Sequence, residues 1–286
     1  MSVKKSARSA IKAQVVRAVQ GAPPPTVLKY VAAAQGQDHM HIPSTRDNGR
    51  VDEQGLPVPP EYLWDGLGAN LNEYLTVGKE HADNMRAALA RHGFEMPDKI
   101  LDFGCGAGRM IRWLKPEAER GTVWGCDITA EYIHWLQRNL RPPFRFFTST
   151  TMPTLPFPDG HFGLVYAGSV FTHIADLAEA WVLEVRRIVK TGGLAYLTVH
   201  DPAAANLMMT FDEYEQKPAA PERLEEYGGL PDDLGMLALD RWPERPSTNV
   251  FYSRDWWQES LAPMFRVLEI TEGAYGYQTA FLAQAV

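Results

Sequence analysis

The feature that most constrains the fold is a regular alternation of short apolar runs and helical segments between residues 99 and 200. Buried strands are predicted at residues 99–104, 122–127, 144–148, 162–167 and 194–200. Helices are predicted between them at residues 107–115, 129–140 and 176–190, the first ending at Pro116. Parallel strands need such crossover helices, so the alternation predicts an α/β fold with a Rossmann-like, doubly wound sheet.

The segments after this core add two strands. Residues 265–271 and 277–284 are apolar runs joined by a short turn, which forces an antiparallel hairpin. The predicted sheet therefore has seven strands, mostly parallel, with an antiparallel C-terminal hairpin strand. Ser253 is expected to cap a helix over residues 254–262.

The remaining segments border this core. A helix is predicted over residues 69–92, preceded by a helix over 8–20 and an extended loop over 36–63. Residues 201–250 contain six prolines and no long periodic element, which indicates an inserted lid. We therefore expect an N-terminal helical cap and loop segment at 1–75 and a main domain at 76–286, with its lid at about 201–252.

Composition excludes several classes of protein. The formal net charge is −7, and the first 37 residues contribute +6, which leaves −13 for the rest. An acidic body argues against nucleic acid as a partner, because phosphate binding needs a basic surface. No apolar run reaches the roughly 18 residues that cross a bilayer. Only two cysteines are present, so a cytoplasmic protein without a disulfide framework is expected.

A glycine-rich segment, ILDFGCGAGRM at residues 100–110, lies where the first core strand is expected to end. Gly104, Gly106 and Gly108 permit a tight turn and let a ligand approach the backbone closely. Asp127 ends the next strand, where a carboxylate can hold two ribose hydroxyls. Together these features predict a nucleotide-type cofactor site at the carboxyl end of the sheet.

The GxGxG spacing resembles the first motif of the class I S-adenosylmethionine-dependent methyltransferases. TLPFPDGHFGLVYAGSVFTHI at 154–174 and RRIVKTGG at 186–193 also resemble segments of that family. Thr191 replaces the usual proline of the second segment, and Gly163 stands where the family often has aspartate. The resemblance covers about residues 75–200 and resumes at the terminal hairpin. It implies S-adenosylmethionine as cofactor and S-adenosylhomocysteine as product.

The resemblance also implies roles for individual residues. Asp102 and the glycine loop, residues 104–108 with Cys105 inside it, should face the methionine part, and Asp127 the ribose. The adenine should lie against Ile128, Thr151 and Met152. The sulfonium should lie beside Ala167, Gly168 and Ser169. Arg109 is expected either to reach the cofactor carboxylate or to lie on a helix surface. Tyr74 and Gly78 are either cofactor contacts or ordinary helix-end residues.

A general base is needed only if the acceptor is a hydroxyl or a protonated amine. His173, His200 and Asp201 follow core strands and are the candidate catalytic residues, since histidine titrates in the useful range. His173 could equally pack beside the adenine, and His200 could serve only as a structural hydrogen-bonding group. No metal is expected, because His39 and His41 have no placed third ligand.

The resemblance implies methyl transfer to a small-molecule acceptor, with a hydroxyl oxygen as first choice. An N- or C-methyltransferase, a nicotinamide-dependent oxidoreductase and a non-catalytic S-adenosylmethionine-binding module are the alternatives. The YAGSVFTH segment is similar to one in bacterial enzymes of secondary or sugar metabolism. The acceptor atom and the oligomeric state are left open.

Overall fold

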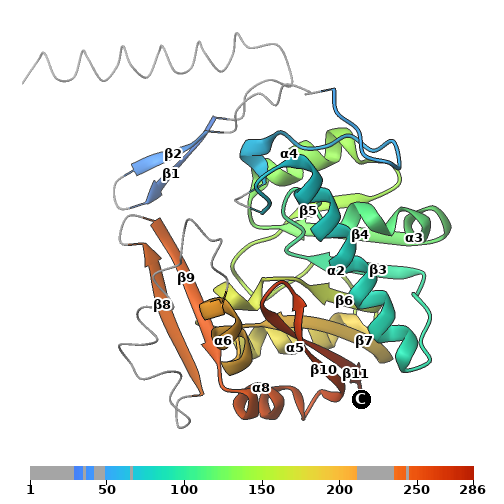
Figure 1. Cartoon of the computed structure of the whole chain (residues 1–286), viewed down its shortest axis with the longest axis vertical. Helices are drawn as coiled ribbons and strands as arrows, with labels where there is room; N and C mark the ends of the chain where they lie inside the picture. The colour runs from blue at the N-terminus through green and yellow to red at the C-terminus, as the bar shows by residue number, and fades with distance from the viewer. Residues whose placement is uncertain (1–28, 35–36, 42–48, 65–66, 211–234, 243–244) are drawn as a thin grey trace, which may run out of the picture. The chain divides into compact units, whose positions relative to one another are not determined.

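Figure 1 shows a computed structural model of the 286-residue chain. It describes residues 29–34, 37–41, 49–64, 67–210, 235–242 and 245–286. The helix expected at 8–20 and half of the expected lid, residues 211–234 and 243–244, lie outside the described residues. The chain divides into two compact units, Met1–Leu63 and Trp64–Val286. The boundary expected near residue 75 falls inside a helix of the second unit.

The first unit contains a hairpin. Strands β1 (Lys29–Ala34) and β2 (Gln37–His41) pair antiparallel, and a short 3₁₀ helix, η1, spans Glu61–Leu63. The Asp52 carboxylate stabilises a turn by accepting the backbone N–H groups of Gln54 and Leu56, each at 2.9 Å. The prediction of loop throughout 36–63 is therefore wrong at β2, because strand pairing with β1 overrides the local composition.

The second unit contains the predicted sheet, whose strands lie side by side in Figure 1 in the order β10-β11-β7-β6-β3-β4-β5. Its seven strands are β3 (Lys99–Phe103), β4 (Thr122–Asp127), β5 (Arg145–Thr148), β6 (Phe162–Ala167), β7 (Val189–Val199), β10 (Phe265–Tyr275) and β11 (Gln278–Ala285). The first five pair parallel, and β11 is antiparallel to both its neighbours. The predicted fold class is confirmed.

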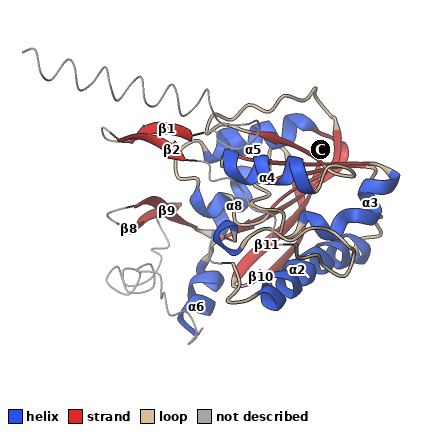
Figure 2. Cartoon of the chain, turned by 90° about the horizontal axis from the view of Figure 1, so that it is seen from above, coloured by secondary structure: helices blue, strands red, loops and turns tan. Residues whose placement is uncertain are grey.

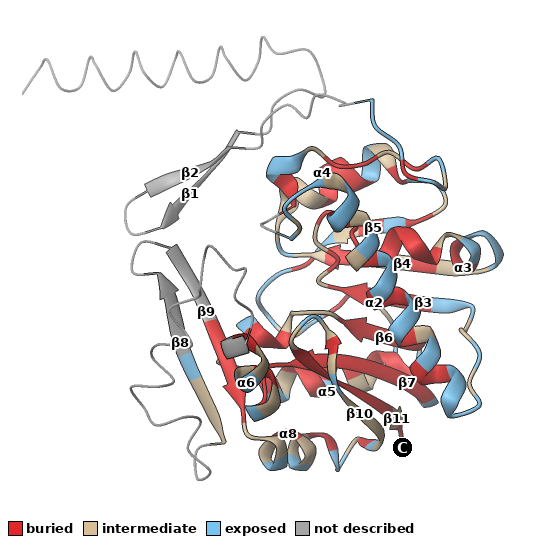
Figure 3. Cartoon of the chain, in the orientation of Figure 1, coloured by how far each residue is buried: buried red, intermediate tan, exposed pale blue. Residues whose placement is uncertain are grey.

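Helices flank the strands on both sides (Figure 2). Two of them, α5 (Ala178–Ile188) and α8 (Arg254–Leu261), bury Trp181 and Trp257 in one core cluster with sheet residues such as Leu101. In Figure 3 the strands β3, β6 and β11 are correspondingly buried along most of their length. Ser253 caps α8 by accepting the Trp256 N–H at 3.1 Å, as predicted.

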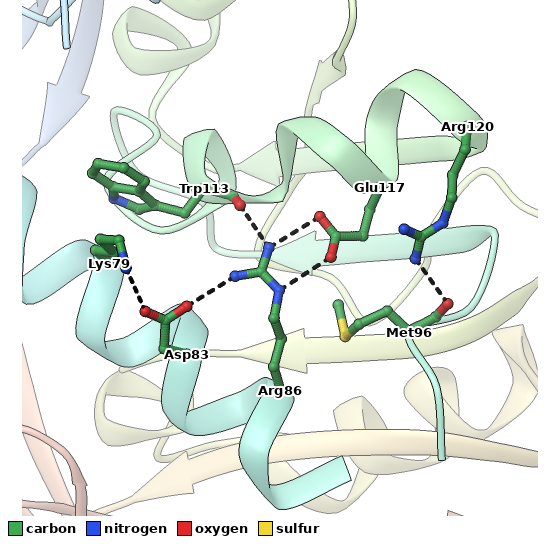
Figure 4. Close-up of polar contacts among 7 residues, drawn as sticks. All are labelled: Lys79, Asp83, Arg86, Met96, Trp113, Glu117 and Arg120. Carbon is green, nitrogen blue, oxygen red and sulfur yellow. Dashed lines mark hydrogen bonds and ion pairs between the residues drawn. The ribbon is translucent and has the colours of Figure 1, made fainter. Parts of the chain in front are cut away.

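Helix α2 (Leu71–Arg91) begins at a capping box. The Asn70 side chain accepts the Glu73 N–H, and the Glu73 carboxylate accepts the Ala69 N–H. Figure 4 shows how α2 is fixed to α3 (Lys115–Arg120): Arg86 donates to both oxygens of Glu117 and to the Trp113 carbonyl. These contacts hold α2 beside the segment that follows the glycine loop.

The helix predicted at 107–115 is the main error in the core. Residues 107–110 form turns, a 3₁₀ helix η2 follows at Ile111–Leu114, and the α-helix begins only at Lys115. Pro116 lies in the first turn of α3 and starts this helix instead of ending the previous one. Its missing N–H costs nothing there, because first-turn N–H groups have no partner within a helix.

Regular elements also occur where only a lid was expected. They are α6 (Pro202–Thr210), β8 (Met236–Trp242) and β9 (Arg245–Tyr252), with β8 and β9 forming an antiparallel pair. The smaller elements of the core are α4 (Ala130–Asn139) and the 3₁₀ turn η3 (Phe171–His173). Of the helices in the described part of the chain, none is long and apolar enough to cross a bilayer.

Candidate functional site

The glycine loop joins β3 to η2 in a conformation that requires glycine. Gly104, Gly106 and Gly108 have φ values of +80°, +51° and +85°. A Cβ at Gly104 would overlap Val170, and one at Gly108 would lie 2.7 Å from a Leu136 methyl group. A Cβ at Gly106 would meet nothing within 4 Å. The outer glycines thus permit internal packing, while the middle one lies where a ligand can approach.

Asp127 fixes this loop to the next strand. One carboxylate oxygen accepts the Gly106 N–H at 2.9 Å, and the other accepts the Thr129 N–H at 2.8 Å. The N–H groups of Gly104 and Cys105 both donate to the Cys126 carbonyl. The Cys105 thiol is buried, which raises its pKa well above the usual value, so the thiolate needed for a nucleophile is disfavoured.

Apolar side chains stand exposed at the ends of β4 and β5. Ile128 follows Asp127 directly and is 59% exposed, and Met152 follows β5 and is 62% exposed. Thr151 beside it is exposed as well. Two exposed apolar side chains near a polar loop are suited to contact a flat apolar ligand group.

Asp102 is a buried carboxyl group near the end of β3. It is 3% exposed, and its Oδ2 has no hydrogen-bond partner among the described residues. Burial raises its pKa to about 8; the neighbouring Tyr166 hydroxyl opposes this effect, and the charge of Asp127 adds to it. Asp102 is in register with Tyr166 of β6 and lies on the face of the sheet opposite Leu101. A cation bound here would lower the pKa again.

Arg109 follows the loop and is buried at 6% exposure, so the interpretation as a helix-surface residue is wrong. Its Nη2 donates to the Tyr275 hydroxyl at 2.8 Å and contacts His81 Nδ1 at 3.3 Å. Its Nε has no partner among the described residues. The backbone turns of residues 107–110 direct this side chain inward, which a helical interpretation of the same residues did not predict.

Tyr74 and Gly78 place α2 directly against the loop. The Tyr74 hydroxyl is 3.5 Å from the Ala107 carbonyl, its ring stacks on Trp64, and burial raises its pKa to about 12. A Cβ at Gly78 would overlap the Arg109 carbonyl oxygen. Both residues therefore shape the loop from behind.

The residues that follow β6 also lie beside the glycine loop, at the carboxyl end of the sheet. Ala167 is buried, and a Cβ at Gly168 would lie 2.6 Å from the Tyr275 ring. Ser169 has φ +61°, a strained value for serine. Its N–H donates to Thr198 Oγ1 at 2.8 Å, and its hydroxyl accepts Gln278 Nε2 at 2.8 Å. A hydrogen-bond network thus holds an unusual backbone conformation beside the glycine loop.

The three catalytic candidates lie in different environments. His173 is exposed at the end of η3. His200 is 1% exposed, and its ring centroid lies 5.0 Å from Phe251 and 5.4 Å from Tyr277. Asn249 is buried in the same strand as Phe251, and its Nδ2 has no partner among the described residues. His200 is thus set among aromatic rings at the end of β7.

Asp201 is held by hydrogen bonds and an ion pair to neighbouring elements. It is fully buried and accepts the Ala204 N–H at 2.9 Å, which caps α6, and the Thr279 hydroxyl at 2.7 Å. Its other oxygen accepts Arg254 Nε at 2.9 Å. Both carboxylate oxygens are thus engaged by neighbouring side chains and backbone, and Asp201 holds these elements together.

Sequence reasoning missed His81, Tyr275, Thr198 and Gln278. None belongs to a local motif: His81 comes from α2, Thr198 from β7, and Tyr275 and Gln278 from the β10–β11 hairpin. Within the described residues, no group of three or more histidine, cysteine, aspartate or glutamate side chains is placed to hold a metal ion.

Residues 101–197 match the methyltransferase domain family, and this match together with the fold and the loop described above makes the chain similar to class I S-adenosylmethionine-dependent methyltransferases. The chain is 29% identical to an uncharacterized 37.1 kDa protein in transposon TN4556 of Streptomyces fradiae, over 68% of this chain and 55% of that protein. It is 27% identical to the demethylmenaquinone methyltransferase of Deinococcus radiodurans, over 57% of this chain and 65% of the enzyme. The chain thus spans less than two thirds of the length of each of these relatives.

Solved structures share the fold. The magnesium protoporphyrin IX methyltransferase of Synechocystis, solved with bound S-adenosylhomocysteine, superposes with a TM-score of 0.50 at 18% identity, over 77% of this chain and 89% of that one. A Pyrococcus horikoshii protein superposes with a TM-score of 0.53 at 17% identity, over 76% and 93% of the two chains. At these identities the likeness concerns the fold alone.

Proposed function

We propose that this protein transfers a methyl group from S-adenosylmethionine to a small-molecule acceptor. The observation that carries the proposal is the pair of buried, incompletely bonded ionisable side chains, Asp102 and Arg109, at the two ends of the glycine loop. The amino-acid end of the cofactor carries one ammonium and one carboxylate. An acid with an unpartnered oxygen and a guanidinium with an unpartnered nitrogen match those two charges.

The other site residues fit the rest of the cofactor. Asp127 would accept the ribose hydroxyls, because a carboxylate has further lone pairs beyond those that hold the loop. Ile128, Thr151 and Met152 would contact the adenine. The segment 167–169 would border the sulfonium, with Tyr74 and Gly78 supporting the loop from α2.

Methyl transfer from S-adenosylmethionine requires no covalent intermediate with the protein. S-Adenosylmethionine supplies a methyl group already activated for in-line displacement. The chain's own task is to align the acceptor with that methyl group and to exclude water, and alignment alone can lower a barrier by several kcal/mol. The strained, hydrogen-bonded turn at Ser169 would keep this edge of the site rigid.

We favour a hydroxyl oxygen as the acceptor atom, with His200 accepting or orienting its proton. Its aromatic surroundings suit an acceptor with an apolar or planar part. His173 is the second candidate, since it is exposed at the same end of the sheet. Asp201 is assigned to structure, because Arg254 and Thr279 already engage its oxygens.

Carbon methylation is the alternative with specific support. The Deinococcus relative is a demethylmenaquinone methyltransferase, and a Desulfotalea psychrophila relative, 22% identical over 54% of this chain and 63% of that protein, is a ubiquinone/menaquinone biosynthesis C-methyltransferase. Nitrogen acceptors remain open, and so does a domain that binds the cofactor without turnover. We also propose a role in bacterial secondary or sugar metabolism. We further propose a cytoplasmic location, because the two cysteines are free and buried, as in proteins of a reducing compartment.

The test is a methyl-transfer assay with S-adenosylmethionine labelled in its methyl group, on acceptors that offer hydroxyl, amine or activated carbon. We expect label in a hydroxyl acceptor, with turnover that falls on His200→Ala and a pH profile that changes. His134→Ala, at a partly buried histidine of α4 outside the candidate set, is the control. Label in carbon only would establish the alternative, and cofactor binding without transfer to any acceptor would indicate a binding module.

A further inference from the structure

Within the described part of the chain, Arg109 has no carboxylate partner, unlike three other arginines of the second unit. Arg86, Arg187 and Arg254 each donate to a buried carboxylate, namely Glu117, Glu184 and Asp201. The hydrogen-bond partners of Arg109 among the described residues are instead an imidazole and a phenol. A buried guanidinium without a counter-ion is costly, because both its charge and its remaining donors have left water. Such a site is ready for an anion.

His81 holds this charge without neutralising it. Its Nδ1 accepts the Arg109 hydrogen bond, so its ring proton is on Nε2. Burial together with the charge of Arg109 lowers the His81 pKa to about 3. Asp102 also senses the charge of Arg109, yet burial keeps the pKa of its carboxyl group raised to about 8, so at neutral pH this group is mostly protonated. The positive charge therefore remains available to a ligand.

Tyr275 connects Arg109 to the end of β6. Its ring stacks on His81 with 3.8 Å between centroids, and its hydroxyl accepts from Arg109. The same ring lies against the backbone of Gly168. Next to it, Asn84 of α2 donates to the Ala274 carbonyl at 3.0 Å, which fixes the hairpin to the helix. The stack thus sets the guanidinium between the glycine loop and the β6 end.

We propose that His81 and Tyr275 are positioning residues, which hold the Arg109 guanidinium as the receptor for a ligand carboxylate. The inference rests on the proposed function, in which the cofactor brings one carboxylate and the acceptor can bring another. The glycine-loop position of Arg109 favours the carboxylate of the cofactor. His81 and Tyr275 act through Arg109 and need not touch the ligand.

The test compares two ligands that differ only in that carboxylate: S-adenosylhomocysteine and its decarboxylated analogue. Calorimetric titration gives Kd for each with the full-length protein and with His81→Leu, His81→Gln and Tyr275→Phe. We expect His81→Leu and Tyr275→Phe to weaken S-adenosylhomocysteine about tenfold, as for a lost hydrogen bond to a charged group, and the analogue by less than about twofold. His81→Gln should restore affinity, because an amide oxygen replaces the acceptor.

A tyrosine elsewhere in the sheet supplies the matched control. Tyr196→Phe removes a buried hydroxyl from β7 and should affect neither ligand. Equal weakening of both ligands by the His81 and Tyr275 variants would overturn the proposal, since it would indicate a general disturbance. Unchanged Kd values for both, together with an unchanged KM for acceptors with and without a carboxylate, would overturn it as well.

The two sources of the carboxylate give different results. If the variants spare both cofactor ligands but raise KM for a carboxylate-bearing acceptor only, the receptor serves the acceptor. Failure of the methyl-transfer proposal is separately visible: discrimination between the two ligands without turnover on any acceptor supports the receptor and contradicts the enzyme.

Discussion

The two halves of the sheet's carboxyl edge are built in different ways. At the ends of β3 and β4, three glycines with positive φ and the backbone N–H bonds to Asp127 create the site. At the end of β7, His200 lies among aromatic side chains brought by β9 and the turn between β10 and β11. The first half is built from backbone conformation, and the second from packed side chains.

The difference between the two halves is seen in two aspartates, Asp127 at the end of β4 and Asp201 just after β7. Asp127 is partly exposed and accepts the N–H groups of Gly106 and Thr129, so it shapes a loop at the surface. Asp201 is fully buried and paired with Arg254, so it ties α6 and α8 to the sheet. Position after a strand therefore does not by itself make an acid functional, because the partners decide its role.

The largest expected effect is a loss of stability when a glycine of the loop between β3 and η2 is replaced. Gly104→Ala should destabilise the protein by about 3 kcal/mol, because alanine resists φ +80° and its Cβ would overlap Val170. Gly106→Ala should cost only about 1 kcal/mol, since its Cβ has open space, yet it should weaken S-adenosylhomocysteine. Urea unfolding and calorimetry measure the two effects. Equal stability losses would contradict the division between internal and ligand-facing glycines.

Arg254→Met removes the ion pair with Asp201 beside the end of β7, in the half of the edge that is built from packed side chains. It leaves the Asp201 charge buried with its remaining donors and should cost about 2 to 3 kcal/mol in urea unfolding, less than for a fully buried pair because Arg254 is about one-third exposed. Cofactor affinity should not change. Glu272→Gln removes the exposed partner of the same arginine and should cost under about 0.5 kcal/mol. A loss of cofactor affinity in Arg254→Met would mean that the two halves are coupled.

Asp102 predicts a pH dependence of stability in the ligand-free protein. Its pKa is raised from 3.8 to about 8, so the folded state binds more protons than the unfolded state between those values. Stability should therefore fall as pH rises from about 4 to 8 and then level off. Asp102→Asn should remove this slope and gain at least about 2 kcal/mol near pH 8, and unfolding curves across pH measure it. The exposed Asp98→Asn is the control, and a parallel slope in both variants would refute the assignment.

The smallest effect concerns the exposed apolar side chains. Ile128→Ser should weaken S-adenosylhomocysteine about threefold to fivefold, because it removes apolar contact of about 1 kcal/mol with the adenine. Stability should stay the same, since the side chain is already exposed. Leu183→Ser, at an equally exposed position on α5, should change neither quantity. Calorimetric Kd values that do not distinguish the two variants would move the adenine elsewhere.

The same contrast explains what the sequence could predict. The strands, the glycine loop with Asp127 and the Ser253 cap follow from local patterns, and the structure contains them. The inward turn of Arg109, the start of α3 at Pro116 and the environment of Asp201 depend on partners distant in sequence. His81 and Tyr275 illustrate this best: neither has a motif, and they meet only because α2 and the β10–β11 hairpin pack together.

The most direct test of the central claim is calorimetric titration of the protein and of Asp127→Ala with S-adenosylhomocysteine, with NAD and NADP as controls. We predict micromolar binding of S-adenosylhomocysteine, weakened at least about tenfold in the variant because both the loop anchor and the ribose acceptor are lost. Neither nicotinamide nucleotide should bind. Equal affinity of the two proteins, or binding of NAD or NADP alone, would contradict a cofactor site built from the glycine loop and Asp127.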